Sequence, residues 1–498
     1  MNVNPITRLD YPDPDVIRVE DTYYMVSTTM HFMPGCEILQ SFDLVHWEHA
    51  TYVYETLDHT DAQQLKSGQN IYGQGMWAAS LRYHEGRFYI CFVANDTRKT
   101  YLYTSEKIDG PWKKQLIEGF YHDGSLLFDE DGRNYIVYGN DEIWITELNE
   151  DLTAPKKDGL HRLLVSDHKN PELGYEGSHI QKINGYYYIF LIHSLRDRWM
   201  RTEACFYSDS LEGEFTGGDV LCDDRGYCGQ GVAQGGIVDT PDGKWYAMLF
   251  QDSGAVGRIP ILLPVTWKDH FPVFGQNGHV PEEIEVHSTR PGYIYQPLLG
   301  SDDFCNGLLP RWQFNHDPDP RYYHLDALQG TYTITTREVC TELTQAVNTL
   351  TQRMSYPSCA AEVTVDASAL KEGDVAGLCA LQSCYAAVGI TKHHGKYEVL
   401  MLDKKEDGIL DMTERTVVES HQMDFRLEAD FCNMKDEAHC YYRVNKGDWL
   451  PIGTVHKLYF KLDHFTGCRF GLFCYAAEET GGSACFRDFK YYDVDEIS

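Results

Sequence analysis

The stretch YPDPDVIRVEDTYYMVST, residues 11–28, places acidic residues directly before a short apolar run. A tight turn follows, and a second run opens with two tyrosines. Two such runs around a tight turn predict an antiparallel hairpin. The pattern returns four more times, as WAASLRYHEGRFYICFV from residue 77, DGSLLFDEDGRNYIVYG from residue 123, EGSHIQKINGYYYIFLI from residue 176 and QGGIVDTPDGKWYAMLF from residue 234.

The five copies keep the same phase. In four of them the leading residue stands 12 positions before the second aromatic residue, as from Trp77 to Tyr89, and in the first copy the interval from Asp13 to Tyr24 is 11. Repeats of this kind with variable outer loops are typical of four-stranded propeller blades. We therefore predict an all-β chain whose residues 1–295 form a five-bladed β-propeller. A run of hairpins in a sandwich is the alternative, but it does not require copies in fixed phase.

The second half of the chain loses this phase from about residue 300. Strand-like segments such as AAEVTVDAS, YAAVGITKHHGKYEVLMLD and HCYYRVNKGDWLPIG predict a jelly-roll-like β-sandwich over residues 300–498. Ten of the 15 cysteines fall here, and no CxxC pair occurs anywhere. These residues are expected to be mostly free, buried thiols, which indicates a reducing compartment and a cytoplasmic location.

The charge balance restricts the partners. A formal net charge of −32 disfavours nucleic acid and anionic substrates and allows a neutral substrate. The acidity also serves solubility. No basic region followed by an apolar region opens the chain, and no run of about 18 apolar residues occurs, so we expect no membrane association.

Propeller geometry predicts one shared pocket. The innermost strands of a propeller line its central channel, so the leading residues of the five copies meet at one end of it. These residues are Asp13, Trp77, Asp123, Glu176 and Gln234. Crowded carboxylates raise one another's pKa, and a protonated acid beside an ionised base is what glycosidic bond cleavage requires. An aromatic ring such as that of Trp77 matches the apolar face of a sugar.

At these residues the sequence resembles glycoside hydrolase family 43, over essentially its whole length. The resemblance implies an inverting mechanism, with Asp13 of PDP as general base and Glu176 of GYEGSHIQKINGYYY as general acid. Asp123 of HDGSLLFDEDG would adjust the pKa of the acid and orient it. The match of GMWAASLRYHEGRFY implies that Trp77 stacks on the sugar, and GRIPILLPVTW implies that Arg258 reaches its hydroxyls.

The segment STTMHFMPG resembles the loop that walls the first sugar subsite, which implies that Met30, His31 and Phe32 lie near the sugar. It differs from the xylosidase-like pattern TFEWFPG, so the choice between xylosyl and arabinosyl units stays open. Gln234 is expected to be among the substrate-binding residues, and it stands where many family members place a histidine toward a channel ion. No metal ligand is therefore assigned and no cofactor is required, although a structural calcium ion stays open.

Family 43 xylosidases and arabinofuranosidases often carry a C-terminal sandwich, one loop of which closes the pocket. The sequence does not identify that loop. The resemblance implies an inverting exo-glycoside hydrolase that releases xylose or L-arabinose from short oligosaccharides in hemicellulose breakdown. The alternatives are a non-catalytic carbohydrate-binding propeller and an endo-arabinanase-type activity. A retaining invertase-type propeller would need NDPNG, RDP and EC motifs that are absent from the corresponding blades.

Three further expectations concern single residues and assembly. Asp15 is expected to be a solvated or turn residue. His31 and His193 can alternatively be interpreted as local hydrogen-bonding groups. A homo-oligomer is compatible with the sequence, which does not determine the oligomeric state.

Overall fold

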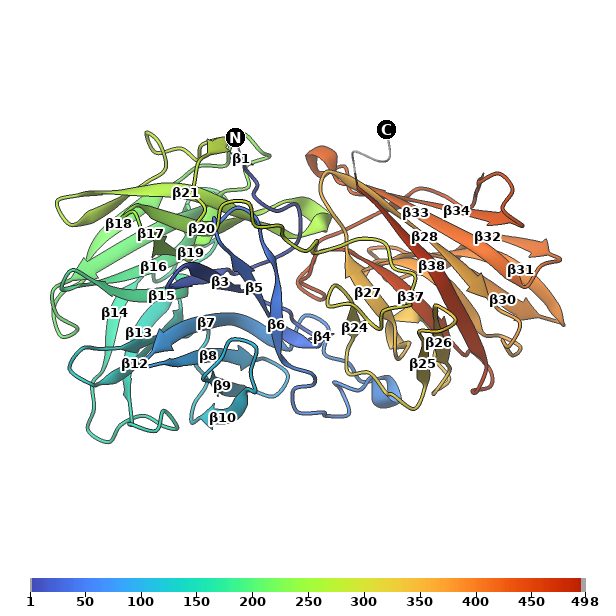
Figure 1. Ribbon diagram of the computed structural model, residues 1–498, viewed down its shortest axis with the longest axis horizontal. Coiled ribbons are helices and arrows are strands. Elements are labelled where there is room, and N and C mark those ends of the chain that lie inside the picture. Colours follow the sequence, from blue (N-terminus) through green and yellow to red (C-terminus); the bar gives the residue numbers. More distant parts are fainter. Residues whose placement is uncertain (1, 494–498) are drawn as a thin grey trace.

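The computed structural model describes residues 2–493, which form two β-rich bodies lying side by side (Figure 1). The propeller is drawn in blue to yellow-green, and most of the sandwich is drawn in gold to red. The helices of this part are four 3₁₀ turns, at Lys66–Gly68, Gly254–Val256, Leu343–Gln345 and Cys432–Met434. None of the helices in residues 2–493 has the length and apolar character needed to cross a bilayer.

Five four-stranded antiparallel sheets form the propeller, each from one continuous segment. The first two blades are β2 (Asp15–Val19), β3 (Thr22–Val26), β5 (Gly35–Ser41) and β6 (Glu48–Tyr54), then β7 (Met76–His84), β8 (Arg87–Ala94), β9 (Lys99–Ser105) and β10 (Lys113–Ile117). The third is β11 (Ser125–Phe128), β12 (Asn134–Asn140), β13 (Glu142–Leu148) and β14 (His161–Ser166). The last two are β15 (Glu176–Ile183), β16 (Tyr186–Ser194), β17 (Arg201–Ser208) and β18 (Thr216–Leu221), then β19 (Val232–Asp239), β20 (Trp245–Asp252), β21 (Arg258–Lys268) and β22 (Phe271–Phe274).

The repeated hairpins of the sequence are the two inner strands of each blade. Strands β15 and β16, for example, are joined by Asn184 and Gly185, both with positive φ (52° and 85°), as a type I′ turn requires. The inner strands β2, β7, β11, β15 and β19 contact one another in ring order. The predicted five-bladed propeller is therefore confirmed.

The propeller axis is filled by a buried polar cluster. Asp15, 1% exposed, accepts hydrogen bonds from the Arg82 guanidinium at 2.8 Å and from the Leu81 amide at 2.7 Å, and it lies 3.1 Å from Nδ1 of His179. Arg82 also donates to the Ser125 hydroxyl at 2.7 Å. The expectation of a solvated Asp15 is wrong, because alternation along β2 turns this side chain into the channel, where its charge is paired with that of Arg82.

The ring is closed near its N-terminus. Strand β1 (Asn2–Val3) pairs with β23 (Glu283–Ile284), which follows the last blade. The side-chain Nδ2 of Asn4 donates to the Leu262 carbonyl at 2.7 Å, and its Oδ1 accepts from the Leu262 backbone amide at 3.1 Å. These contacts attach the start of the first blade to strand β21 of the fifth.

Two antiparallel sheets form the sandwich and confirm the second predicted fold. One runs in the order β32 (Leu410–Val418), β31 (Lys396–Lys404), β30 (Ala386–His393), β29 (Val375–Leu381), β37 (Arg469–Tyr475), β27 (Leu350–Arg353), β24 (Gln313–Asn315) and β4 (Phe32–Met33). The other runs in the order β25 (Tyr323–Asp326), β26 (Thr331–Thr335), β38 (Ser483–Asp493), β28 (Ser358–Asp366), β33 (Gln422–Asp430), β34 (Glu437–Val444) and β35 (Leu450–Pro451), with β36 (His456–Lys457) also on β34. Strand β4 comes from the first blade, so the two bodies share a sheet.

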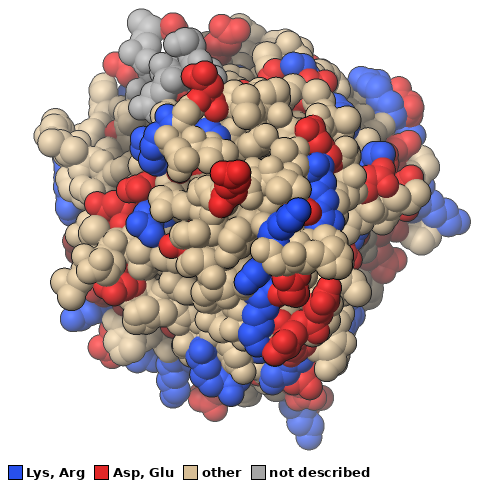
Figure 2. Space-filling model, turned by 90° about the vertical axis from the view of Figure 1, so that its right-hand side faces the viewer, with Lys and Arg blue, Asp and Glu red and all other residues tan. Residues whose placement is uncertain are grey.

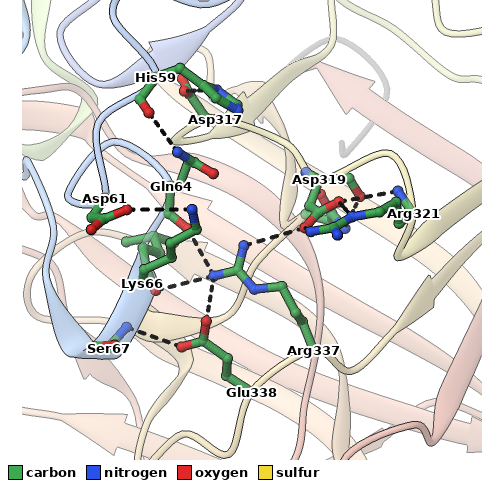
Figure 3. A network of polar contacts seen from close by, with 12 residues as sticks. His59, Asp61, Gln64, Lys66, Ser67, Asp317, Asp319, Arg321, Arg337 and Glu338 are labelled. Atoms are coloured by element: carbon green, nitrogen blue, oxygen red, sulfur yellow. Dashed lines mark hydrogen bonds and ion pairs between the residues drawn. The ribbon is translucent and has the colours of Figure 1, made fainter.

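Further contacts hold the two bodies together. Ala255, Val256 and Ile259 of the propeller pack into the main sandwich core. Figure 3 shows a polar network between the connection from β6 to β7 and the sandwich. There Arg337 donates to the Gln64 carbonyl at 2.9 Å, and His59 lies 2.8 Å from Asp317. The segment that leads into Trp77 is thereby fixed against the sandwich.

The cysteines and the surface charge agree with the composition. All 15 cysteines are free and ten are buried, as expected. On the sandwich end of the molecule, acidic and basic side chains are interspersed (Figure 2). The net negative charge is therefore not gathered into one patch on this face.

Candidate active site

Asp13 lies in the turn before β2, in the left-handed region at φ 53°. The turn is fixed by Thr28, whose amide donates to the Pro12 carbonyl at 3.2 Å. One carboxylate oxygen of Asp13 accepts from the Thr28 hydroxyl at 2.6 Å, and the other accepts from Nη1 of Arg258 at 2.9 Å. The two donors hold both oxygens and thereby orient the carboxylate, as a positioned general base requires.

Asp123 and Glu176 face each other from neighbouring blades. Asp123, at φ 47°, precedes β11, and its carboxylate accepts from the Gly177 amide at 3.0 Å. The Glu176 carboxylate, at the start of β15, accepts from the Asn140 amide at 2.9 Å. Burial raises the pKa of Asp123 to about 6, and the charges of Glu176 and Asp13 act in the same direction. The three acids, spread over 160 positions of sequence, therefore converge on one site.

His122 is a fourth ionisable group here, which the sequence reasoning missed. Its Nε2 lies 3.5 Å from Oδ2 of Asp123 and 3.6 Å from Oε2 of Glu176. The only available signal was its place in the motif HDGSLLFDEDG, directly before Asp123.

Arg258 is positioned from both bodies. Its amide donates to Asp10 at 2.7 Å, and the other carboxylate oxygen of Asp10 accepts from the Gly467 amide of the sandwich at 2.8 Å. The guanidinium pairs with Asp13, while its Nε and Nη2 are buried without a hydrogen-bond partner. Buried donors of this kind are rare unless a ligand satisfies them, so a sugar hydroxyl is a suitable acceptor.

A loop of the sandwich reaches the site. The segment between β36 and β37 brings the Phe465 ring to 5.4 Å from the ring of Trp77 and to 4.3 Å from the guanidinium carbon of Arg258. The backbone of Leu462 in this loop lies against Gly73, ahead of Trp77. Phe465 and Trp77 are both partly exposed, so they present aromatic surface beside the acids. The sequence predicted such a loop without identifying it.

The segment carrying Met30, His31 and Phe32 is packed between the propeller and the sandwich, and its expected place near the first sugar subsite stays a prediction. All three side chains are at most 1% exposed. Met30 forms two backbone hydrogen bonds with Met76, which positions Trp77. Phe32 packs into the sandwich with Arg469 over its ring at 3.4 Å. This packing arises because strand β4 joins the sandwich sheet.

His31 lies in an aromatic cluster between the two bodies. Its ring is 4.8 Å from Tyr72, 4.9 Å from His316 and 5.0 Å from His464. Neither of its nitrogens has a partner at full hydrogen-bond geometry, and Asn315 is the side chain that hydrogen-bonds toward it, so its second interpretation as a local hydrogen-bonding group stays a prediction. Burial lowers the pKa of His31 and His316 well below the usual value, and that of His464 to about 3.

Two other residues lie in buried polar surroundings, and a contact between Gln234 and the substrate stays a prediction. Gln234, 4% exposed and at φ 65°, stands at the inner position of the fifth blade, with its side chain against Gly177. Its amide donates to the buried carboxylate of Glu203 at 2.8 Å. His193 is a local hydrogen-bonding group, at 3.2 Å from Asp167 and 2.8 Å from Asp219.

The arrangement defines a class of protein. Three carboxyl groups from different blades converge beside partly exposed aromatic rings and unpaired guanidinium donors. This combination suits the cleavage of glycosidic bonds. The fold and site are those of a glycoside hydrolase.

Comparison with known proteins identifies the family. Residues 3–272 match Glycosyl hydrolases family 43, and residues 301–492 match the beta-xylosidase C-terminal concanavalin A-like domain. The chain belongs to glycoside hydrolase family 43.

Individual relatives agree with this assignment. A beta-xylosidase of Formosa agariphila is 27% identical over 99% of this chain and 89% of its own length. A non-reducing end alpha-L-arabinofuranosidase of Bacteroides ovatus is 24% identical over 82% of this chain and 79% of its own length. The solved structure of a bifunctional protein of Bacteroides eggerthii, described as GH43-CE, superposes with a TM-score of 0.91 at 42% identity. That match covers 99% of this chain, which spans 63% of the bifunctional chain.

Proposed function

We propose that this chain is an inverting exo-glycosidase that removes a terminal xylose or L-arabinose from short xylo- or arabino-oligosaccharides of hemicellulose. The observation that carries the proposal is the position of Phe465, which comes from the sandwich and lies against both Trp77 and Arg258 at one side of the site. A site bounded on one side suits a chain end better than an internal segment. Relatives named beta-xylosidase and alpha-L-arabinofuranosidase support the choice of sugars.

In the proposed mechanism Asp13 takes a proton from the attacking water. The Thr28 hydroxyl and Arg258 hold both carboxylate oxygens and thereby orient the base. Glu176 protonates the leaving oxygen from the opposite side of the sugar, as inversion requires. Asp123 accepts from the Gly177 amide, so it fixes the backbone directly after the acid.

Sugar recognition follows from the remaining surface. The partly exposed rings of Trp77 and Phe465 offer apolar contact for the sugar ring. The free donors of Arg258 bind sugar hydroxyls, and its bond to Asp13 couples that binding to the orientation of the base. A substrate lacking the hydroxyl that Arg258 binds would leave buried donors unpaired and would react slowly.

We propose further that hydrolysis needs no cofactor. Arg82 supports this, because its guanidinium supplies a positive charge on the propeller axis, where it is bonded to Asp15 and Ser125. The Asp15 carboxylate thereby has a cationic partner without a metal ion. A cytoplasmic location is supported by the 15 free thiols, which suit a reducing compartment. A structural calcium ion and a homo-oligomer stay predictions.

The test compares nitrophenyl β-xyloside, nitrophenyl α-arabinofuranoside and the matching oligosaccharides. We expect hydrolysis of at least one, with proton NMR showing the inverted anomer as first product. Glu176→Gln should lose about 10²–10⁴-fold in kcat on oligosaccharides and less on nitrophenyl substrates, because a good leaving group needs less protonation. Asp13→Asn should lose a similar factor on both. Calorimetric binding of xylobiose without hydrolysis of any substrate would instead favour a carbohydrate-binding protein.

A further inference from the structure

His122 is the ionisable residue of the pocket that the three-acid mechanism does not use. Its backbone is fixed, because its carbonyl accepts from the Gly139 amide at 3.0 Å. Its Nε2 is buried between Asp123 and Glu176, at 3.5 and 3.6 Å, without a hydrogen bond to either. Contacts of this length in a free enzyme often shorten when substrate binds.

The charges that face His122 are negative. Asp123 is its neighbour in the chain, Glu176 approaches from β15 and Asp13 from the turn before β2. The Trp77 ring, 6.1 Å away, is uncharged. The charge of Asp123 raises the pKa of His122 to about 9 against the effect of burial, and Glu176 and Asp13 act in the same direction.

This arrangement creates a conflict within the three-acid mechanism. A general acid must have a proton at the working pH, yet an imidazolium beside Glu176 favours its ionised form. The conflict disappears if the two groups share one proton, because strongly interacting groups titrate as a pair.

We propose that His122 holds, as an imidazolium, the proton that Glu176 delivers to the leaving oxygen. This rests on the proposed function and extends it by a positioning residue that acts through Glu176. When a chain end displaces water, the Nε2–H bond breaks and an O–H bond forms on Glu176, leaving both groups neutral.

The remaining steps balance protons and electrons. The Glu176 proton passes to the glycosidic oxygen as the bond from that oxygen to the anomeric carbon breaks, and the bonding electrons stay on the oxygen. Water adds to the anomeric carbon and gives its proton to Asp13. Solvent then removes the proton from Asp13 and returns one to His122, which restores the free enzyme.

The test is the pH dependence of kcat/KM for His122→Asn on an oligosaccharide substrate. The neutral amide cannot hold the proton, so the alkaline limb should move to lower pH by about one unit or more, a loss of about tenfold at the alkaline end. Activity on the acid side should stay within a few-fold of that of the unaltered enzyme. His84→Asn is the matched control, because His84 ends β7 at the far end from Trp77 and stacks on Phe128.

Two kinetic results would overturn the proposal. A purely structural His122 would lower the rate by the same factor at every pH. An imidazolium that merely weakens Glu176 as an acid would give an alkaline limb that moves to higher pH in His122→Asn. Thermal unfolding of both variants establishes that they are folded.

A second measurement needs neither activity nor the His122 variant. Nitrogen NMR of labelled histidine, in the unaltered protein and in Glu176→Gln, should show one imidazole with a pKa well above 6.5 that falls when Glu176 loses its charge. If every raised imidazole pKa is the same in both proteins, or none is raised, the inference is wrong. If no pentoside is hydrolysed, the proposed function fails, while the titration still decides whether His122 holds a proton beside Glu176.

Discussion

Replacing Phe465 by alanine tests whether the sandwich completes the active site. The ring contributes one contact with Arg258, at 4.3 Å, and one with Trp77, at 5.4 Å. A cation–π contact is worth about 0.5–2 kcal/mol and an aromatic pair about 0.5–1.5 kcal/mol. Together these two contacts contribute about 1–3.5 kcal/mol to holding Arg258 and Trp77 against the sugar.

That contribution converts to a loss of about 5-fold to about 400-fold in kcat/KM, since about 1.4 kcal/mol corresponds to a factor of ten. The assay is hydrolysis of the preferred nitrophenyl pentoside, together with the inhibition constant of the free pentose. The kcat/KM for the pentoside should fall and the inhibition constant of the pentose should rise, because substrate and free sugar lose the same aromatic surface.

Leu462→Ala is the matched control. Leu462 belongs to the same loop but is 75% exposed, so its truncation should leave both constants unchanged. Thermal unfolding separates a local effect from loss of the fold. Unchanged kcat/KM and pentose inhibition in folded Phe465→Ala would refute the idea that the sandwich forms part of the pocket.

Three further changes test the framework of the site. Asp10→Asn weakens the link between Arg258 and Gly467, so kcat/KM should fall about tenfold; unchanged steady-state kinetics would contradict this link. Asp15→Asn leaves Arg82, whose side chain is only 13% exposed, without its charge partner, so urea unfolding should show a loss of about 3–5 kcal/mol, and a loss below about 1 kcal/mol would contradict the pairing. His31, His316 and His464 are neutral when folded because their pKa values are lowered, whereas the unfolded chain takes up protons below about pH 6.5. The free energy of unfolding should therefore fall as pH drops from 7 to 5, by up to about 1.4 kcal/mol per pH unit for each histidine, and His31→Leu should flatten the slope. An unaltered slope in that variant would exclude His31 as a contributor.

The sequence predicted the propeller because its evidence is local and repeated. Each inner hairpin has its own turn and strand alternation, and the copies share one phase around the ring. That phase also places Asp13, Asp123 and Glu176 at equivalent ends of inner strands. Convergence of the acids therefore follows from symmetry, without knowledge of any individual contact.

The tertiary structure alone decided everything that depends on how the two bodies dock. Phe465 reaches Trp77 across almost 400 positions of sequence, and Phe32 turns into the sandwich because strand β4 pairs with β24. Asp15 pairs with Arg82 in the channel, and His122 lies between two carboxylates of different blades. No local periodicity encodes these contacts, because each depends on the relative position of segments far apart in the sequence. The sequence by itself thus determined which residues surround the axis, and the packing of blade against blade and of propeller against sandwich determined which side chains touch one another there.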